Sequence, residues 1–234
     1  MTGGKHSELT VACLKWGIKY SVDYVNILHD MVRRNLTVPH RFVCLADNPA
    51  GIRCETLPIV PDLPTWWGKL TLFGHPIPGR ILYFDLDTVI VGNIDGFAAY
   101  DGPFCLIKPF YRGRGFASGV MSIGPDFGSH VWDRFARDPR SAIDFCRRHA
   151  DPPWNHGDQR WLELNVERAD YWQDVLPGQL ASYKVHCGAG LPVGARVVCF
   201  HGKPDPHELA DSWVLHHWRV IAPTQAADGG VSSL

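Results

Sequence analysis

Ile81-Leu82-Tyr83-Phe84-Asp85-Leu86-Asp87-Thr88-Val89-Ile90-Val91 is the stretch that decides the fold. Apart from two carboxylates it is apolar, β-branched and aromatic, which is typical of a buried strand. Acids at the carboxyl end of such a strand require a cation or hydrogen-bond donors. Ligands of open α/β sheets collect at that end, so Asp85 and Asp87 are predicted to hold a metal ion. Oxygen ligands favour Mn²⁺ or Mg²⁺ over zinc. A strand that turns out to solvent, with Asp87 capping the turn, remains an alternative.

A longer segment around the two acids resembles a known enzyme family. Residues 82–95 read Leu-Tyr-Phe-Asp-Leu-Asp-Thr-Val-Ile-Val-Gly-Asn-Ile-Asp. They resemble the metal-binding core of retaining glycosyltransferases of the glycogenin and galactosyltransferase type (family 8-like), which have the GT-A fold. The resemblance implies that Asp85 and Asp87 hold Mn²⁺, or Mg²⁺, against the diphosphate of a nucleotide sugar, with Leu86 also at the donor.

Size and composition favour one α/β domain over residues 1–224, followed by a disordered tail at 225–234. The net charge of −1, with both signs interspersed, argues against a nucleic-acid partner. The sequence contains neither an apolar run of transmembrane length nor an apolar signal-peptide core near the N-terminus, so a cytoplasmic protein is expected. The seven scattered cysteines form no C-x-x-C pair, and we expect reduced core thiols.

The first part of the chain predicts a β-α-β unit. Apolar runs at 10–14 and 40–46 favour strands, and the spacing of apolar residues between them predicts a helix over 22–35. A third, short strand is expected at 54–60. The resemblance implies that the first strand and its loop hold the nucleotide base and ribose, through Leu14, Lys15, Trp16 and Tyr20. Packing at the helix entry is the alternative interpretation of Trp16 and Tyr20.

Lys69 lies in a predicted helix, within Trp66-Trp67-Gly68-Lys69-Leu70. An ammonium beside a diphosphate is a sensible counter-ion, and the resemblance places a lysine here near the donor's phosphate or sugar. A solvated helix lysine is the alternative. The two tryptophans suit either a sugar-stacking surface or the core.

Three further elements are predicted beyond the acidic stretch. They are an antiparallel strand at residues 104–107, a basic, glycine-rich loop over the site at 111–115 and one amphipathic helix at 132–148. Phe116-Ala117-Ser118-Gly119-Val120 resembles the family segment Phe-Asn-Ser-Gly-Val, which implies that Ser118 and Gly119 meet the donor sugar. Ala117 replaces the asparagine, and this puts one hydrogen bond to the donor in doubt.

Two later segments complete the predicted site. Asp158-Gln159 opens a helix and resembles the family's Asp-Gln beside the anomeric carbon, which implies catalytic roles for both; an ordinary first-turn helix acid is the alternative. Residues 196–200 predict a last buried strand. It ends in His201-Gly202-Lys203-Pro204, a shorter version of the family's His-x-x-Gly-x-x-Lys-Pro. The resemblance implies that His201 is the third metal ligand and that Gly202 and Lys203 meet the diphosphate.

These features predict a metal-dependent glycosyltransferase that uses a nucleotide sugar, most simply a UDP-sugar, with retention of configuration and an unknown acceptor. Asp-Leu-Asp-Thr-Val also resembles the nucleophile motif of haloacid-dehalogenase-type phosphohydrolases, but that motif normally opens its fold and here follows a β-α-β unit. A non-catalytic nucleotide-sugar-binding domain is the third interpretation.

Overall fold

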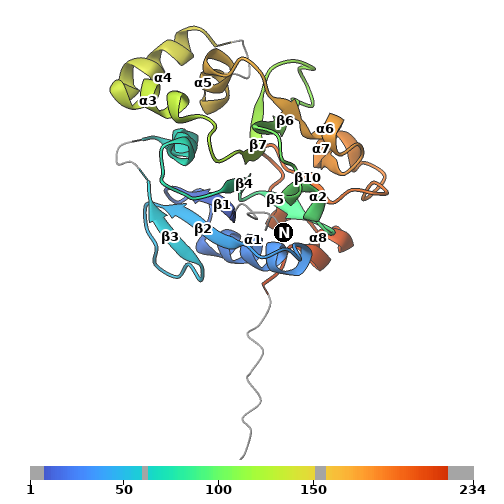
Figure 1. Ribbon diagram of the computed structural model, residues 1–234. Helices are drawn as coiled ribbons and strands as arrows, with labels where there is room; N and C mark the ends of the chain where they lie inside the picture. The colour runs from blue at the N-terminus through green and yellow to red at the C-terminus, as the bar shows by residue number, and fades with distance from the viewer. Residues whose placement is uncertain (1–7, 60–62, 151–156, 221–234) are drawn as a thin grey trace, which may run out of the picture.

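A computed structural model of the chain describes residues 8–59, 63–150 and 157–220. A seven-stranded sheet in the order β3-β2-β1-β4-β7-β6-β8 crosses the molecule, with a three-stranded sheet β5-β10-β9 beside it. Helices cover both faces of the large sheet (Figure 1). The sheet is mixed and mostly parallel, since β7 alone runs antiparallel to its two neighbours, β4 and β6. The expected α/β class and mostly parallel sheet are confirmed.

The predicted β-α-β unit is present as β1 (Leu9–Lys15), α1 (Val22–Asn35) and β2 (Arg41–Ala46). Successive residues of β1 face opposite sides of the sheet, so Val11 and Cys13 pack on the side of α1 while Ala12 and Leu14 pack on the other. The third strand, β3, covers Glu55–Pro58. Residues 60–62 lie outside the described chain, so the end of that prediction is not described.

The stretch 81–91 forms two strands, which corrects the prediction of a single one. β4 (Arg80–Phe84) belongs to the large sheet and β5 (Thr88–Ile90) to the small one. The Asp85 amide donates to Gly119 O at 2.8 Å, and the Thr88 amide donates to Asp85 O at 3.1 Å, which closes a turn. The two carboxylates therefore lie at the point where the chain passes from one sheet to the other.

The next strand agrees with the sequence. The antiparallel strand predicted at 104–107 is β6 (Phe104–Ile107), and it pairs with β7 (Ala117–Ile123), a strand that the sequence interpretation did not assign. The remaining short elements are α2 (Asp95–Ala98), β8 (Asp170–Tyr171), α6 (Trp172–Val175), β9 (Leu180–Ser182), α7 (Tyr183–His186), β10 (Val197–Cys199), η2 (Pro206–Glu208) and α8 (Ser212–His217).

The single helix predicted over 132–148 is wrong, because the segment contains two helices, α3 (Ser129–Arg137) and α4 (Pro139–Arg148). Asp138 has φ −156° and ψ 85°, and its carboxylate accepts from the Ser141 amide at 3.0 Å. Pro139 has no N–H to continue α3 but fits the first position of a new helix. α5 (Asp158–Asn165) begins at Asp158, as predicted.

The face of the sheet opposite α1 is covered by α3, α4, α5 and the 3₁₀ helix η1 (Thr65–Phe73). Trp67 of η1 is buried and stacks on Phe135, with ring centroids 5.7 Å apart. Trp66 is 42% exposed. Of the two sugar-stacking candidates, Trp67 is therefore a core residue and Trp66 is a surface one.

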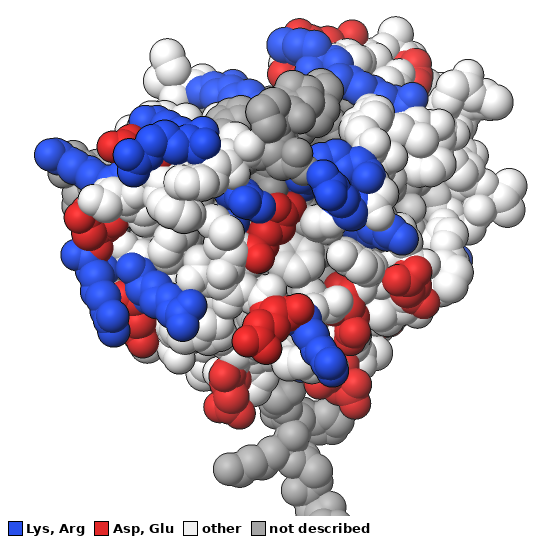
Figure 2. All heavy atoms as spheres, turned by 90° about the horizontal axis from the view of Figure 1, so that it is seen from above, with Lys and Arg blue, Asp and Glu red and all other residues white. Residues whose placement is uncertain are grey.

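All seven cysteines are free, and all but the half-buried Cys54 are buried. Among the described residues, the helices are too short or too polar to cross a bilayer. Figure 2 shows acidic and basic side chains of both signs spread across one face. The predicted tail at 225–234 lies outside the described residues.

Candidate active site

Asp85 lies at the centre of the site, directly after the end of β4. Its Oδ1 accepts from the Tyr83 hydroxyl at 2.7 Å. Lys69 Nζ lies 2.8 Å from Oδ1 and 3.0 Å from Oδ2, so one ammonium bridges both oxygens of the carboxylate. The Asp85 side chain is 30% exposed, so it is only partly withdrawn from water, and the ammonium compensates its charge at the end of an apolar strand.

Lys69 also connects Asp85 to a second carboxylate from a distant segment. Its ammonium donates to Ser118 Oγ at 3.2 Å, and the Ser118 hydroxyl donates to Asp158 Oδ2 at 2.5 Å. Lys69 Nζ lies 4.0 Å from that same oxygen. All three side chains are buried. The 3₁₀ helix η1, strand β7 and the first turn of α5 thus converge on the end of β4, and three predicted site residues meet there with Asp85.

Burial and charge set the proton affinities of this cluster. Burial by itself lowers the pKa of Lys69, but the charges of Asp85 and Asp158 outweigh it and raise that pKa. Burial raises the pKa of Asp158, against the opposing effects of Lys69 and the Ser118 hydrogen bond. Lys69 is therefore a firmly protonated cation between two acids.

Asp87 lies in the same turn with a separate partner. Its Oδ2 accepts from the Tyr20 hydroxyl at 2.9 Å, which brings the loop after β1 to the acidic turn. Burial, followed by the negative charge of Asp85, raises the pKa of Asp87 to about 7. Part of the Asp87 carboxyl is therefore protonated at neutral pH.

His201 reaches the same region through the small sheet. In the antiparallel β5–β10 pair, Thr88 is opposite Cys199. Asp87 directly precedes Thr88, and His201 follows Cys199 by two residues, so this pairing brings the two segments together. His201 Nε2 is buried and has no hydrogen-bond partner in the described part of the chain. Burial lowers the pKa of His201, and the charge of Asp85 acts in the opposite direction.

The aromatic rings of Phe110 and Tyr111 lie against the His201 imidazole, with centroids 5.3 and 6.2 Å away. They belong to the loop between β6 and β7, which was expected over the site. Arg112 of this loop pairs with Glu163 of α5 at 3.0 Å. The loop is thereby tied to the helix that carries Asp158.

The three predicted metal ligands are not gathered around one point. In residues 8–59, 63–150 and 157–220, no three His, Cys, Asp or Glu side chains form a group that could hold a metal ion. Asp85 faces Lys69 and Tyr83, while Asp87 faces Tyr20. The ligand set Asp85, Asp87 and His201 therefore remains a prediction.

A cavity of about 270 Å³ adjoins the loop after β1. Lys15 and Tyr20, both predicted to meet the nucleotide, line it together with Ser21 and Asn48. Trp16 is 40% exposed. Leu14 and Leu86 are core residues on opposite faces of the sheet, so only their backbones are available to a ligand.

The other predicted residues occupy less constrained positions. A Cβ at Gly119 would lie 3.4 Å from Asp85 Oδ2, an ordinary contact. Gln159 is half-buried in the first turn of α5. Gly202 has φ 65°, in the left-handed region. Lys203 is 70% exposed at its side chain and pairs with Asp205 at 2.9 Å and with Glu208. Its ammonium is thus held by two acids of its own loop.

Tyr83 is a site residue that the sequence interpretation missed. It was taken as part of the apolar strand, yet its hydroxyl contacts Asp85. Residues two apart on a strand point to the same face, and a buried tyrosine hydroxyl needs a partner, so this pair could have been found from spacing alone.

Two proteins whose solved structures have a similar fold are glycosyltransferases. Over 86% of this chain, the glycosyltransferase GlyE of Streptococcus pneumoniae TIGR4 matches with a TM-score of 0.59 and 14% identity. The galactosyltransferase LgtC, solved with donor and acceptor sugar analogs, matches 91% of the chain with a TM-score of 0.58 and 10% identity. The chain has the GT-A glycosyltransferase fold.

The GT-A match covers 97% of LgtC but only 56% of GlyE, so this chain spans little more than half the length of GlyE. No protein-family model matches the sequence, and no curated protein matches it. Identities of 10–14% carry the GT-A fold alone.

Proposed function

We propose that this protein is a glycosyltransferase that transfers a sugar from a nucleoside-diphosphate sugar, most simply a UDP-sugar, to an acceptor with hydroxyl groups. The observation that carries the proposal is the cluster of the half-buried Asp85 with the buried Lys69, Ser118 and Asp158 at the carboxyl end of β4, in a GT-A fold. The 270 Å³ cavity beside Tyr20 adjoins the same end of the sheet, where α/β folds bind nucleotides.

The side-chain types at the proposed metal site suit a divalent cation, although the structure does not gather the three side chains around one point. His201 Nε2 is a buried nitrogen without a partner among the described residues. The pKa of Asp87 is raised to about 7 because burial and Asp85 leave its charge uncompensated. Two carboxylates and an imidazole suit Mn²⁺, which would neutralise the leaving nucleoside diphosphate. Asp85, Asp87 and His201 are the residues proposed to hold it.

Lys69 is proposed to bind the donor. Its ammonium is already next to both oxygens of Asp85, so a donor phosphate can take the place of that carboxylate as its partner. Lys69 would then place positive charge at the diphosphate while keeping its hydrogen bond to Ser118.

Asp158 is proposed to stabilise the positive charge that develops on the sugar as the diphosphate leaves. Its carboxylate is buried and oriented by the Ser118 hydroxyl, so little reorganisation is needed. Retention of configuration is the outcome expected from the family resemblance. Both front-face attack by the acceptor and a double displacement are compatible with one carboxylate here.

The test is release of UDP from UDP-glucose, UDP-galactose and UDP-N-acetylglucosamine, each with Mn²⁺, Mg²⁺ or EDTA. We expect metal-dependent release with one donor, and a loss of about 100-fold in Asp85→Asn, the size typical of a removed electrostatic group. Asp133→Asn, on an exposed turn of α3, is the matched control. Release that is equal in EDTA would contradict the metal dependence.

Two arms separate the alternatives. Hydrolysis of p-nitrophenyl phosphate that disappears in Asp85→Asn would indicate the phosphohydrolase reaction instead. A thermal shift with a UDP-sugar and Mn²⁺, without any release of UDP, would indicate a non-catalytic binding domain.

A further inference from the structure

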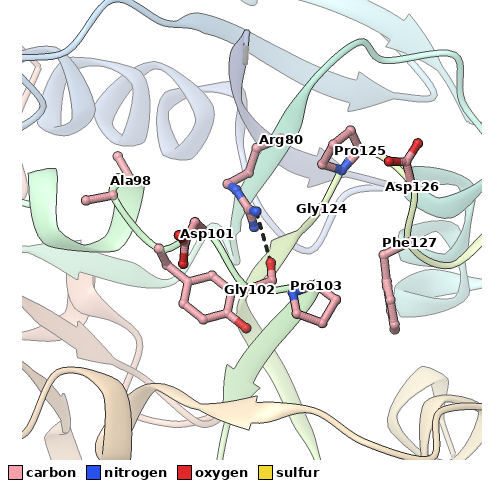
Figure 3. Close-up of a pocket in the computed structure, with 11 residues that line it drawn as sticks. Arg80, Ala98, Asp101, Gly102, Pro103, Gly124, Pro125, Asp126 and Phe127 are labelled. Carbon is pink, nitrogen blue, oxygen red and sulfur yellow. Dashed lines mark hydrogen bonds between the residues drawn. The ribbon is translucent and has the colours of Figure 1, made fainter. Parts of the chain in front are cut away.

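A second cavity, of about 600 Å³, is lined by Arg80 (Figure 3), at the start of β4, whereas the candidate active site lies beyond the other end of that strand. Arg80 starts β4 and lines this cavity, whereas Asp85 follows the last residue of the strand. At about 3.3 Å per residue, the two are separated by roughly 16 Å along the strand. The segments before β6 and after β7 supply the other walls, so the cavity is separate from the site described above.

Arg80 provides a buried positive charge in this cavity. The residue is 8% exposed. Its guanidinium donates to Ser122 Oγ and to Gly102 O, both at 2.9 Å, and lies 5.3 Å from the centre of the Tyr100 ring. A guanidinium has five N–H groups, and in the described chain these two acceptors are neutral and no carboxylate pairs with it. It retains donors for a ligand.

The rim of the cavity carries charge of the opposite sign. Asp101 and Asp126 are exposed and lie on the two sides of the cavity, as Figure 3 shows. Neither carboxylate has a hydrogen bond or ion pair with another residue of the described ranges, whereas the hydroxyl of the neighbouring Tyr100 donates to Asp170 Oδ2 at 2.7 Å. The rim therefore offers the carboxylate acceptors of Asp101 and Asp126, and the base offers the N–H donors of Arg80.

The mixed signs restrict the class of ligand. An anion that reaches Arg80 must pass two carboxylates, and a cation drawn to the rim meets the guanidinium at the base. Neutral hydroxyl groups both donate and accept, so they satisfy both sets. The volume lies in the range of about 300–1,000 Å³ found for small-molecule sites. A free amino acid carries both charges but is small for this space.

We propose that this cavity is a saccharide-binding site, in which Asp101 and Asp126 accept from sugar hydroxyls and Arg80 donates to them. The proposal does not depend on the function proposed above, because it rests on the charges and volume of a different end of the sheet.

The test is a titration of the ¹⁵N-labelled full chain with lactose and with maltose, followed by NMR. We expect saturable shifts of the Arg80 Nε–H signal and of the Gly102 and Phe127 amides. Inorganic phosphate and glycine betaine are the anionic and zwitterionic probes. Shifts of these signals by phosphate or betaine but by neither sugar overturn the proposal, and so does the absence of saturable shifts with both sugars.

Substitutions at the rim sharpen the test. Asp101→Ala/Asp126→Ala removes exposed side chains that have no hydrogen bond or ion pair with another described residue, so the fold should be retained. We expect sugar affinity to fall about tenfold, the equivalent of one charge-assisted hydrogen bond, while phosphate binds more tightly. Asp133→Ala, outside the cavity, should change neither. Unchanged sugar affinity in the double variant overturns the proposal.

Discussion

Strand β4 has a charged site at each end, and the two sites are neutralised differently. Beyond its carboxyl end, Asp85, Lys69 and Asp158 compensate one another within 4.0 Å, through Ser118. At its start, the buried Arg80 hydrogen-bonds a serine hydroxyl and a backbone carbonyl and lies over an aromatic ring, with no ion pair in the part of the chain that the structure describes. A closed network of opposite charges loses much when one member is removed, whereas a cation with neutral partners loses less. The comparison predicts a graded series of effects.

The largest effect is expected for Lys69→Met. The variant leaves Asp85 and Asp158 without their shared cation, and we expect the free energy of unfolding in EDTA to fall by about 3–5 kcal/mol. Urea denaturation at pH 7.5 measures it. Lys69→Arg, which keeps the charge, should recover part of the loss. If Lys69→Met costs less than Arg80→Met, the proposed contrast between the two ends is wrong.

A smaller effect is expected for Arg80→Met at the other end of the strand. Ser122 and Gly102 lose their hydrogen bonds to the guanidinium while Ser122 remains buried, and we expect the free energy of unfolding to fall by about 1–3 kcal/mol. The same urea series gives the value. Arg80→Lys should recover less than Lys69→Arg does, because an ammonium cannot reach Ser122 and Gly102 in the geometry of a guanidinium.

Tyr83→Phe tests the hydrogen bond that the sequence did not reveal. Removing the hydroxyl deprives Asp85 of one donor, and we expect a loss of about 1 kcal/mol in stability. The fit of the ring is unchanged, so Tyr100→Phe, whose hydroxyl serves Asp170, is the control for loss of a buried phenol. Under the proposed function, UDP release should change in Tyr83→Phe and not in Tyr100→Phe.

The pH dependence of stability tests the cluster beyond the carboxyl end of β4, which contains the buried Asp158. The pKa of Asp158 is raised in the folded state, so the folded protein retains the proton at pH values where the unfolded chain has lost it. Stability contributed by this group is therefore full below about pH 4, the ordinary aspartate value, and falls as pH rises through the folded-state pKa.

Asp158→Asn removes this titration. The free energy of unfolding of the variant minus that of the unchanged protein should rise as pH increases from about 4. This difference should be smallest at the acidic end of the range. Thermal unfolding across this range in EDTA is the measurement, and Asp133→Asn is the comparison. A difference that shrinks with rising pH would mean that Lys69 stabilises the charged form of Asp158 more than burial opposes it.

The smallest effect is expected for Asp126→Ala alone, at the rim of the second cavity. An exposed side chain without partners in the described chain should change the free energy of unfolding by less than about 0.5 kcal/mol. A larger loss would show that this rim is structural, and would remove its carboxylate from the proposed saccharide contacts.

Local patterns in the sequence determined the elements that depend on neighbouring residues. Alternating and apolar runs gave β1, β2, β6 and β10, and the spacing of apolar residues gave α1 with its observed ends, Val22 and Asn35. Asp158 was recognised as an acid in the first turn of a helix, and α5 begins at this residue. The helix over 132–148 was predicted wrongly although the signal that divides it is local. Asp138 caps a new helix that Pro139 begins, and the apolar pattern over 132–148 obscured this boundary.

Only the tertiary structure decided how distant segments meet. The apolar run 81–91 contains no signal that its two halves join different sheets, because that depends on the pairing of β4 with β7 and of β5 with β10. Tyr20 reaches Asp87 across 67 positions, and Ser118 reaches Asp158 across 40. The cavity around Arg80 likewise forms from chain segments that are separate in sequence. Such contacts arise from strand order and packing, whereas residue periodicity reports only which face of an element is buried.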